Sequence, residues 1–388
     1  MDSVGSDLKL KSLFHGYYEN EQLDPPDLLQ SREIGYIPFN GSMSRHRRIL
    51  TSAELKYFVL NAVPRHLYYS TSYYRRPEEK KMQDKEWLGA ELIFDLDADH
   101  IKGADSMTFV QILDEVKKHT LRLIHDFLMG DLGFDESELK VFFSGGRGYH
   151  VHVLSEKVYE MSSDSRREIT DYIRGENVSA RGIISSAGKR QFMGGWPRKV
   201  DLALSTYFRN LPREREEAKE AVKAILENGN TARSFVDFLN RPVKIGSRTM
   251  KRIDIYSMEG WEKYSVSESD QRFERILEYI ITVTRDQLSS EIDDPVTTDV
   301  HRLIRFPGSL HGKTGLKVIN VRIGDMERFD PLKEAIPKSF LNGSANIQAE
   351  REISIEMNER HIDVNPGKNE VPLYAAVFLV ASKRAVFV

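Results

Sequence analysis

The spacing of apolar residues divides most of the chain into helices and strands. Residues 51–63 carry apolar side chains at helical intervals and are followed by Pro64, which predicts a helix that ends there. Residues 90–97 alternate apolar and polar side chains, which is typical of a strand with one buried face. Residues 107–129 repeat apolar positions every three or four residues up to Gly130, and we predict a second helix. We also expect a strand and loop at 66–81, strands at 140–143, 150–154, 301–306 and 316–323, and a last helix at 372–385.

The character of the chain changes between residues 206 and 284. This stretch begins with a highly charged amphipathic helix, and residues 231–239 and 271–281 show two more helical patterns. Strand patterns return after it. We therefore predict a mixed α/β fold of the α+β type, in which a helical subdomain at 206–284 is inserted into a mixed-sheet core formed by 1–205 and 285–388.

Composition excludes several classes of protein. The 388 residues include no cysteine, which rules out disulfides, thiol nucleophiles, iron–sulfur clusters and zinc sites that use sulfur. The 56 Lys and Arg residues nearly balance the 59 Asp and Glu residues, so any site for a polyanion must be a local cluster of cations. The longest apolar run, at 374–381, is far shorter than the roughly 20 residues of a membrane span, and the N-terminus lacks the apolar stretch of a signal peptide. We expect a soluble intracellular protein that has no membrane partner.

Two carboxylates stand at the end of the predicted strand at 90–97. Asp95 and Asp97 point to the same side of that strand because side chains alternate along it. Adjacent carboxylates repel each other unless a cation lies between them, and hard oxygen ligands of this kind suit Mg²⁺ or Mn²⁺. The alternative is an acidic cluster that caps a turn or forms salt bridges.

A glycine-rich turn, SGGRGYHVHV, joins the two strands predicted at 140–143 and 150–154. Its glycines allow close backbone approach to a ligand, and their amides with Ser144 and Arg147 can form an anion site. His150 and His152 share one strand face, so at least one of them can face the same cleft as the acids. The alternative is an ordinary glycine-rich hairpin with a solvated arginine.

The segment 292–318 is the richest in chemistry. It combines acids, cations and a histidine around a tight loop, which suits a metal-bound triphosphate because carboxylates hold the ion and cations neutralise phosphate oxygens. The alternative is a charged loop between two edge strands. The groups concerned are Asp293, Asp294, Asp299, Arg302, Arg305, His311 and Lys313.

In their order along the chain, DLDAD, SGGRGYH and HRLIRFPGSLHGKTG resemble the motifs of the catalytic small subunit of archaeal and eukaryotic DNA primase. The N-terminal REIGYIPF, RHR and PRHLYYSTSYYRRP are also similar to that family, so the resemblance covers most of the chain. It implies a primase catalytic core with metal binding by Asp95, Asp97 and Asp293, for which the adjacent Asp294 is the rival. It further implies that the nucleotide phosphates are bound by Ser144, Arg147, His150, Arg305, His311 and Lys313.

The same resemblance implies an activity and its partners. The expected enzyme is a nucleotidyltransferase that makes short primers on single-stranded DNA from nucleoside triphosphates, by a mechanism that uses two Mg²⁺ or Mn²⁺ ions. The family pairs this subunit with a large subunit. Family members commonly carry a cysteine-rich zinc site, but without cysteine we expect no structural zinc here. The residue sequence of the HGKTG motif favours an archaeal, cytoplasmic protein; a eukaryotic protein would be nuclear.

The sequence leaves two other functions open. One is a primase-like polymerase or end-joining nucleotidyltransferase, which shares the metal site but extends existing ends. The other is a non-catalytic nucleic-acid-binding subunit with a degenerate site, against which the full set of acids and phosphate donors argues. In any of the three, dispersed cations would hold the nucleic acid through its backbone. The candidates are Arg45, Arg47, Arg48, Arg75, Arg76, Lys80 and Lys81.

Overall fold

The chain forms two compact units in the computed structural model, which describes residues 3–101, 103–186, 194–260, 262–266 and 270–388. The first unit comprises Met1–Thr170 and Glu291–Val388, and the second is Asp171–Ser290. The predicted insertion, 206–284, falls inside the second unit. Helices and several small sheets are mixed along the chain, so the predicted α/β class is confirmed.

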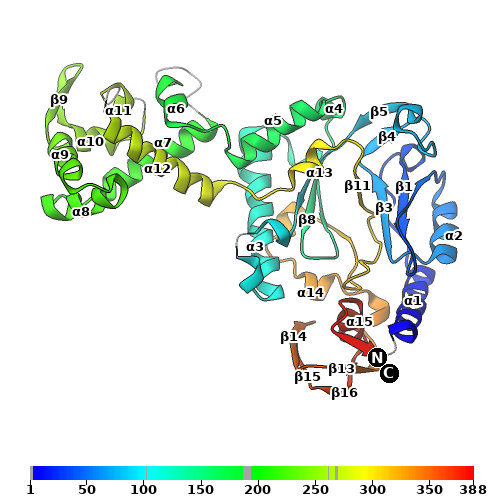
Figure 1. The fold of residues 1–388 in the computed structure, drawn as a ribbon. Helices are drawn as coiled ribbons and strands as arrows, with labels where there is room; N and C mark the ends of the chain where they lie inside the picture. The colour runs from blue at the N-terminus through cyan, green and yellow to red at the C-terminus, as the bar shows by residue number, and fades with distance from the viewer. Residues whose placement is uncertain (1–2, 102, 187–193, 261, 267–269) are drawn as a thin grey trace. The chain divides into compact units, whose positions relative to one another are not determined.

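A four-stranded antiparallel sheet forms the centre of the first unit. Its strands lie in the order β12 (Ile319–Val321), β7 (Leu139–Phe143), β8 (Tyr149–Val153) and β6 (Leu92–Leu96). Every residue of β8 is buried, and β6 exposes only Asp95, in part. Helix α3 (Phe109–Arg122) packs against β6 and β8 (Figure 1). The predicted helix at 107–129 therefore begins after a capping Thr108, and its last part, Leu123–Asp131, is π-helical.

A second antiparallel sheet lies beside the first. Its order is β11 (Leu303–Arg305), β3 (His66–Ser70), β1 (Ile34–Ile37) and β2 (Ser44–Arg47). Helix α2 (Ser52–Ala62) follows β2, and a hairpin of β4 (Ser72–Tyr74) and β5 (Trp87–Ala90) connects β3 to β6. The connection is close, because the Glu91 amide donates to the Thr71 carbonyl at 3.1 Å. The two sheets thus bring β6 and β11, which are more than 200 residues apart, into one unit.

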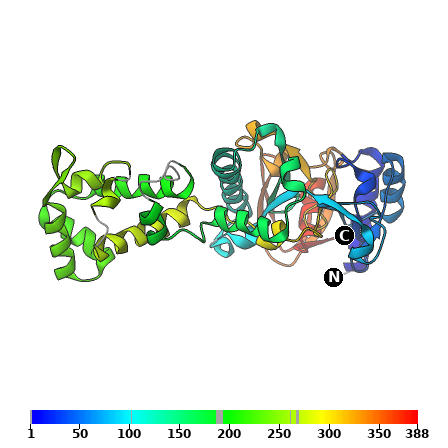
Figure 2. The same cartoon turned by 90° about the horizontal axis from the view of Figure 1, so that it is seen from above.

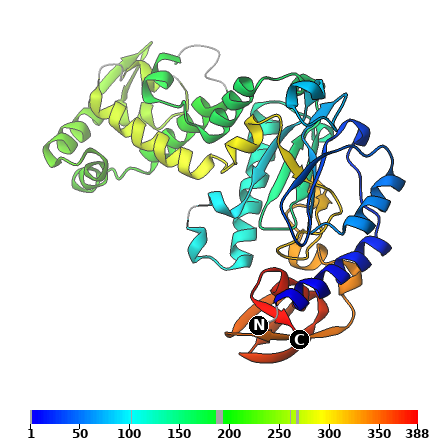
Figure 3. The same ribbon diagram turned by 45° about the vertical axis from the view of Figure 1, so that its right-hand side comes forward.

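The C-terminal part of the first unit adds a third sheet that the sequence patterns did not predict. It has the order β16 (Gly367–Pro372), β13 (Ser344–Ala349) and β17 (Ala385–Phe387), and β14 (Ile353–Met357) pairs with β15 (Arg360–Val364). Helix α15 (Leu373–Ala381) packs on this sheet, so the helix predicted at 372–385 ends earlier and the chain turns into β17. Helix α1 (Ser3–Asn20) joins it, since Ser6 Oγ accepts from the Phe387 amide at 2.9 Å. The two termini consequently lie close together (Figures 1 and 3).

Shorter helices complete the framework around the central sheet. Helix α13 packs against β6, which matters for the site below. These helices are α4 (Glu156–Tyr159), α13 (Asp294–Thr298), α14 (Pro331–Glu334) and α5 (Ser163–Arg174), of which the residues up to Thr170 belong to this unit.

The second unit is helical and has its own apolar core. Phe208 and Phe273 stack in that core at 6.3 Å between ring centroids, beside Tyr256. The predicted charged helix begins at Arg215, because the Glu214 side chain caps it. Figure 2 shows these helices from above. They are α6 (Ala180–Ser186), α7 (Gly195–Asn210), α8 (Arg215–Leu226), α9 (Gly229–Leu239), α10 (Arg252–Tyr256), α11 (Glu262–Ser265) and α12 (Gln271–Leu288), with the hairpin β9 (Pro242–Ile245) and β10 (Arg248–Lys251).

A search of the helices in the described ranges finds none with the length and apolarity that crossing a bilayer requires.

Candidate active site

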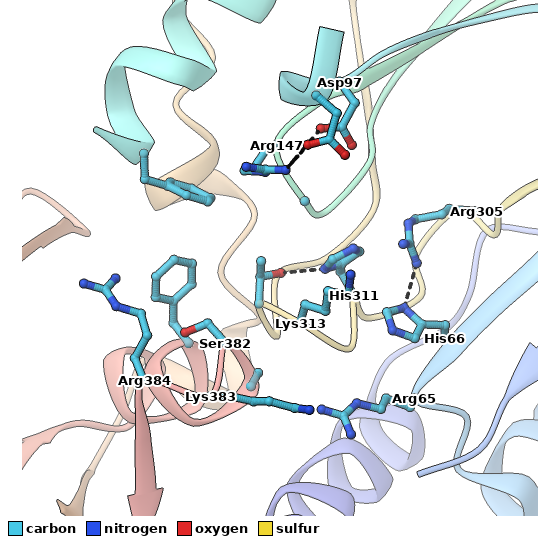
Figure 4. A pocket seen from close by; sticks show the side chains of 16 residues that line it. Arg65, His66, Asp97, Arg147, Arg305, His311, Lys313, Ser382, Lys383 and Arg384 are labelled. Atoms are coloured by element: carbon cyan, nitrogen blue, oxygen red, sulfur yellow. Dashed lines mark hydrogen bonds and ion pairs between the residues drawn. The ribbon is translucent and has the colours of Figure 1, made fainter. Parts of the chain in front are cut away.

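A cavity of about 570 Å³ opens in the first unit, where the end of β6, the glycine-rich turn, the loop after β11 and the end of α15 meet (Figure 4). Its charged lining is strongly cationic, with only Asp97 and Asp99 as carboxylates. The cationic side chains are Arg65, Arg147, Arg305, Lys313, Lys383 and Arg384. Such a lining favours an anionic ligand. The two carboxylates stand together at one end of the cavity, apart from most of the cations.

The acidic end of the site comes from β6. Asp95 lies opposite His150 in the pairing of β6 with β8, and His150 Nε2 is 3.5 Å from Asp95 Oδ1. Burial raises the pKa of the Asp95 carboxyl to about 7, and the Asp97 and Asp293 carboxylates add to this effect. A raised carboxyl pKa of this kind indicates a buried acid whose neighbouring carboxylates are not fully neutralised by cations.

Asp293 reaches this end through a long-range backbone contact. Its amide donates to the Asp95 carbonyl at 2.9 Å, which places the start of α13 beside β6. The neighbouring Asp294 is engaged elsewhere, since its carboxylate accepts from Thr170 Oγ1 at 2.5 Å. The Asp293 backbone thus lies beside the end of β6, whereas the Asp294 side chain is hydrogen-bonded to α5.

The donor set fits a hard divalent cation in its chemistry. Asp97 Oδ1 is buried and has no hydrogen-bond partner among the described residues, and the closest cation, Arg147 Nη2, is 4.0 Å away. A cation at this position would compensate Asp97 and the crowded Asp95 carboxyl. Within the described ranges, no three Asp, Glu or His side chains lie close enough together to form a complete metal-binding cluster.

The glycine-rich turn lies directly on the end of β6. A Cβ at Gly148 would come within 2.2 Å of the Leu96 carbonyl, so only glycine allows this approach. The turn is closed by the Ser144 amide, which donates to the Gly148 carbonyl at 3.0 Å. Arg147 at its tip donates to Asp99 Oδ1 at 2.6 Å, which holds the guanidinium at the cavity wall.

The two histidines of β8 contact different carboxylates. His150 faces Asp95, as one of the pair was expected to do. His152 instead contacts Glu91, with His152 Nδ1 2.8 Å from Glu91 Oε2, and both side chains are buried. His152 therefore belongs to the interior beneath the site.

The loop after β11 brings the remaining predicted groups into the cavity. Arg305 Nη1 donates to His66 Nδ1 at 2.7 Å, and the Gly312 amide donates to the same atom at 3.3 Å. Since both partners are donors, His66 Nδ1 is the acceptor and the ring is neutral with its proton on Nε2. Burial lowers the pKa of His66 to about 3, and Arg305 contributes to this shift. Lys313 lines the cavity beside it.

His311 is also neutral in this arrangement. Thr314 Oγ1 donates to the Gly145 carbonyl, so it accepts from His311 Nδ1 at 3.3 Å. The Nε2 lone pair of His311 then faces the glycine-rich turn, where a Cβ on Gly146 would lie 3.3 Å from it. Burial and the nearby Arg305 lower the pKa of His311 well below its ordinary value.

The N-terminal cations expected to hold nucleic acid are mostly paired with carboxylates. Arg45 contacts Glu33 at 2.8 Å, and Arg76 contacts Glu86 at 3.1 Å. Arg47 differs, because its guanidinium lies over the Phe58 ring at 4.7 Å from the centroid. Arg48 and Arg75 have longer contacts to Glu78 and Glu86, at 3.7 and 3.4 Å.

Four basic residues that line the cavity were not among the predicted site residues. His66 begins the stretch predicted as a strand and loop, and Arg65 directly precedes it; neither was assigned a role in the site. Lys383 and Arg384 follow α15, in a segment interpreted wholly as a packing helix. Arg65 and His66 lie in a segment that resembles the family, but that resemblance assigned them no role, and the tertiary fold brings all four residues to the cavity.

Comparison with known proteins agrees with this geometry. The family model for the DNA primase small subunit matches residues 94–323. The DNA primase small subunit PriS of Picrophilus torridus is 43% identical over 380 residues, which cover 98% of each chain. The corresponding proteins of Thermoplasma volcanium and Thermoplasma acidophilum are 38% and 37% identical, and the matches cover 97% or more of each chain. Because the family model matches more than half of the chain and these relatives are similar over nearly the full length, the chain belongs to the DNA primase small subunit family.

Proposed function

We propose that this chain is the catalytic subunit of a DNA primase, which joins nucleotides from nucleoside triphosphates into short primers on single-stranded DNA. One observation carries the proposal: a cavity whose carboxylates stand at one end and whose other charged groups are cations. That polarity matches a metal-bound triphosphate, whose reacting phosphate needs divalent ions and whose other phosphates need cationic partners.

In this proposal Asp95, Asp97 and Asp293 would hold two Mg²⁺ or Mn²⁺ ions. When bound, these ions would supply activation of the attacking 3′-hydroxyl and charge neutralisation at the phosphates. His150 contacts Asp95 across the sheet and thereby orients its carboxylate.

The remaining groups would hold and orient the triphosphate. The Ser144 hydroxyl accepts from the Gly146 amide at 3.2 Å, which leaves its own O–H to donate to a phosphate oxygen. Arg147 is held at the wall by Asp99. Arg305 presents a planar fork whose direction is fixed by His66, while Lys313 acts as a point charge. His311 completes the set next to Gly146. No covalent intermediate is required.

A primer-synthesis assay tests the proposal. The full-length chain, alone and with a large subunit, is given single-stranded DNA, nucleoside triphosphates and Mg²⁺ or Mn²⁺. Asp95→Asn and Asp97→Asn should each lower synthesis by about 100-fold or more, since each removes a charge that acts in the transition state. Asp126→Asn, a change at an exposed carboxylate outside the cavity, is the matched control.

The same assay separates the other two functions. Extension of a supplied primer without synthesis from single nucleotides would indicate an end-extending polymerase. Absence of both activities, together with no metal-dependent triphosphate binding, would indicate a non-catalytic subunit and would contradict the proposal.

We also propose a primase large subunit as partner and the cytoplasm of an archaeon as location. The relatives' name, small subunit, supports the partner, and their source organisms support the location. Absence of structural zinc stays a prediction, which metal analysis of the purified chain after dialysis tests.

A further inference from the structure

The wall of the cavity away from Asp97 is formed mostly by cations that have no ion-pair partner among the described residues. Lys383 and Arg384 follow α15, and in Figure 4 Lys383 and Arg65 point toward one another. Within the described ranges no carboxylate forms an ion pair with Lys313, Lys383 or Arg384. Among the described residues Arg65 has one long ion pair, with Asp7 at 3.7 Å, and its Nε donates to the Gly312 carbonyl at 3.2 Å. Like charges that converge in one cavity favour an anion between them.

The backbone fixes this arrangement. The Lys383 amide donates to the Val380 carbonyl at 3.0 Å, and the Arg384 amide donates to the Leu379 carbonyl at 2.9 Å. This is the Schellman end of a helix, which places Lys383 in the left-handed region with φ +59°. Glycine is preferred at that position because a side chain is strained there. The chain instead keeps a lysine whose side chain lines the cavity.

The neighbouring arginine shows the same lack of compensation. Burial lowers the pKa of the Arg384 guanidinium, and the nearby Arg351 lowers it further. Arg384 is partly buried, so it is less screened by solvent than a surface cation. An arriving anion would relieve this crowding of positive charge.

We propose that Lys383, together with Arg65 and Lys313, forms a subsite for the terminal phosphate of the nucleoside triphosphate. This inference rests on the proposed function, which puts the reacting phosphate at the carboxylate end of the cavity. The distal phosphates then extend toward the cationic wall. The subsite makes the chain select triphosphates over nucleotides with fewer phosphates.

Substitution of Lys383 by glycine is an unusually clean test. Lys383→Gly removes the cation and also removes the backbone strain, so the melting temperature should equal or exceed that of the wild type. Binding of nucleoside tri-, di- and monophosphates is measured with Mn²⁺ and without template, using the full-length chain. Triphosphate should bind about tenfold more weakly to the variant, because a charged contact is lost, whereas monophosphate should be unaffected.

Two further variants serve as controls. Lys383→Arg keeps the charge and should keep the preference for triphosphate. Lys368→Ala removes an exposed lysine of β16 that does not line the cavity, and it should change no affinity.

Each other outcome overturns the proposal in a recognisable way. Unchanged triphosphate affinity in a folded Lys383→Gly variant would show that Lys383 binds no terminal phosphate. Equal weakening for all three nucleotides would show a general electrostatic effect in place of a subsite. If Lys383→Gly binds triphosphate normally but cannot start new primers, the cationic wall binds a different anion, and the proposal is wrong. If the wild-type chain binds no triphosphate at all, the proposed function itself fails.

Discussion

Arg32 lies wholly buried beneath the candidate site and organises the residues around it. Its guanidinium forms an ion pair with Glu91 and donates to the carbonyls of Ser70 and Thr71 at 2.9 Å each. Glu91 also accepts from His152, so one carboxylate joins the end of β3 to the centre of β8. A buried ion pair is stable only when such additional hydrogen bonds satisfy both partners.

Glu91→Gln tests the value of this pair. Burial alone would raise the pKa of Glu91, but Arg32 and His152 hold it at about 2, below its ordinary 4.5. At pH 7 the substitution should lower the free energy of unfolding by about 3–5 kcal/mol, because the buried Arg32 loses its counter-charge. Circular dichroism during urea denaturation measures this loss.

The pH dependence follows from the lowered pKa. Stability from the ionised Glu91 is complete above the unfolded pKa of 4.5 and is lost as the pH falls toward 2. The wild type should lose about 3 kcal/mol of its free energy of unfolding across this window. The difference in free energy of unfolding between the wild type and Glu91→Gln should therefore become smaller as the pH falls. A gap that stays constant between pH 5 and 3 would contradict the assigned pair.

His311 predicts proton uptake on nucleotide binding. The free ring is neutral and turns the Nε2 lone pair toward the glycine-rich turn. A phosphate there raises the pKa of the ring, so binding should take up as much as about one proton and should weaken as the pH rises. Calorimetry in buffers of different ionisation enthalpy measures the uptake. His311→Gln should abolish it, and equal uptake in that variant would assign the proton elsewhere.

At the scale of elements, the glycine-rich turn depends on its contact with β6. Gly148→Ala would force a Cβ to within 2.2 Å of the Leu96 carbonyl, so the turn must move away. We expect a loss of about 1–3 kcal/mol in stability and a marked loss of triphosphate binding. Gly324→Ala is the control, because a Cβ at Gly324 meets nothing within 4 Å. Thermal unfolding measures the loss of stability, and nucleotide titration measures the loss of binding. If Gly148→Ala binds triphosphate normally, the glycine-rich turn is not part of the binding site.

The elements that the sequence predicted well are those whose pattern is local. The apolar pattern was sufficient to place Asp95 on β6, although the strand ends at Leu96 and Asp97 follows it. Helical spacing was sufficient to predict α2 and α3. The end of α15 was hidden, because Lys383 occupies the left-handed position where glycine would have marked a stop. The third sheet was missed because β13 pairs with β17, about 40 residues away, and mixed polar strands carry little signal.

At the scale of the whole chain, the site depends on contacts that no local pattern contains. One backbone hydrogen bond, from the Asp293 amide to the Asp95 carbonyl, joins residues almost 200 positions apart, and it supports the proposal that Asp293 is the third carboxylate. Likewise, Arg305 is oriented by His66, which lies on another strand of the same sheet. Motif order made the family recognisable, whereas the cationic wall became visible only when α15 was in place.

The second unit contains a buried ion pair of its own. We therefore expect that a substitution in this pair changes the stability of the second unit without affecting the site in the first unit. Lys263 Nζ lies 2.6 Å from Asp201 Oδ1, and both side chains are buried within the unit. Lys263→Met leaves that carboxylate without its cation and should cost the unit about 3–5 kcal/mol. Hydrogen exchange should then accelerate in Asp171–Ser290, while exchange at β6 and β8 and the affinity for triphosphate stay as in the wild type. Because the two units have separate cores, equal acceleration in both would show that they unfold together.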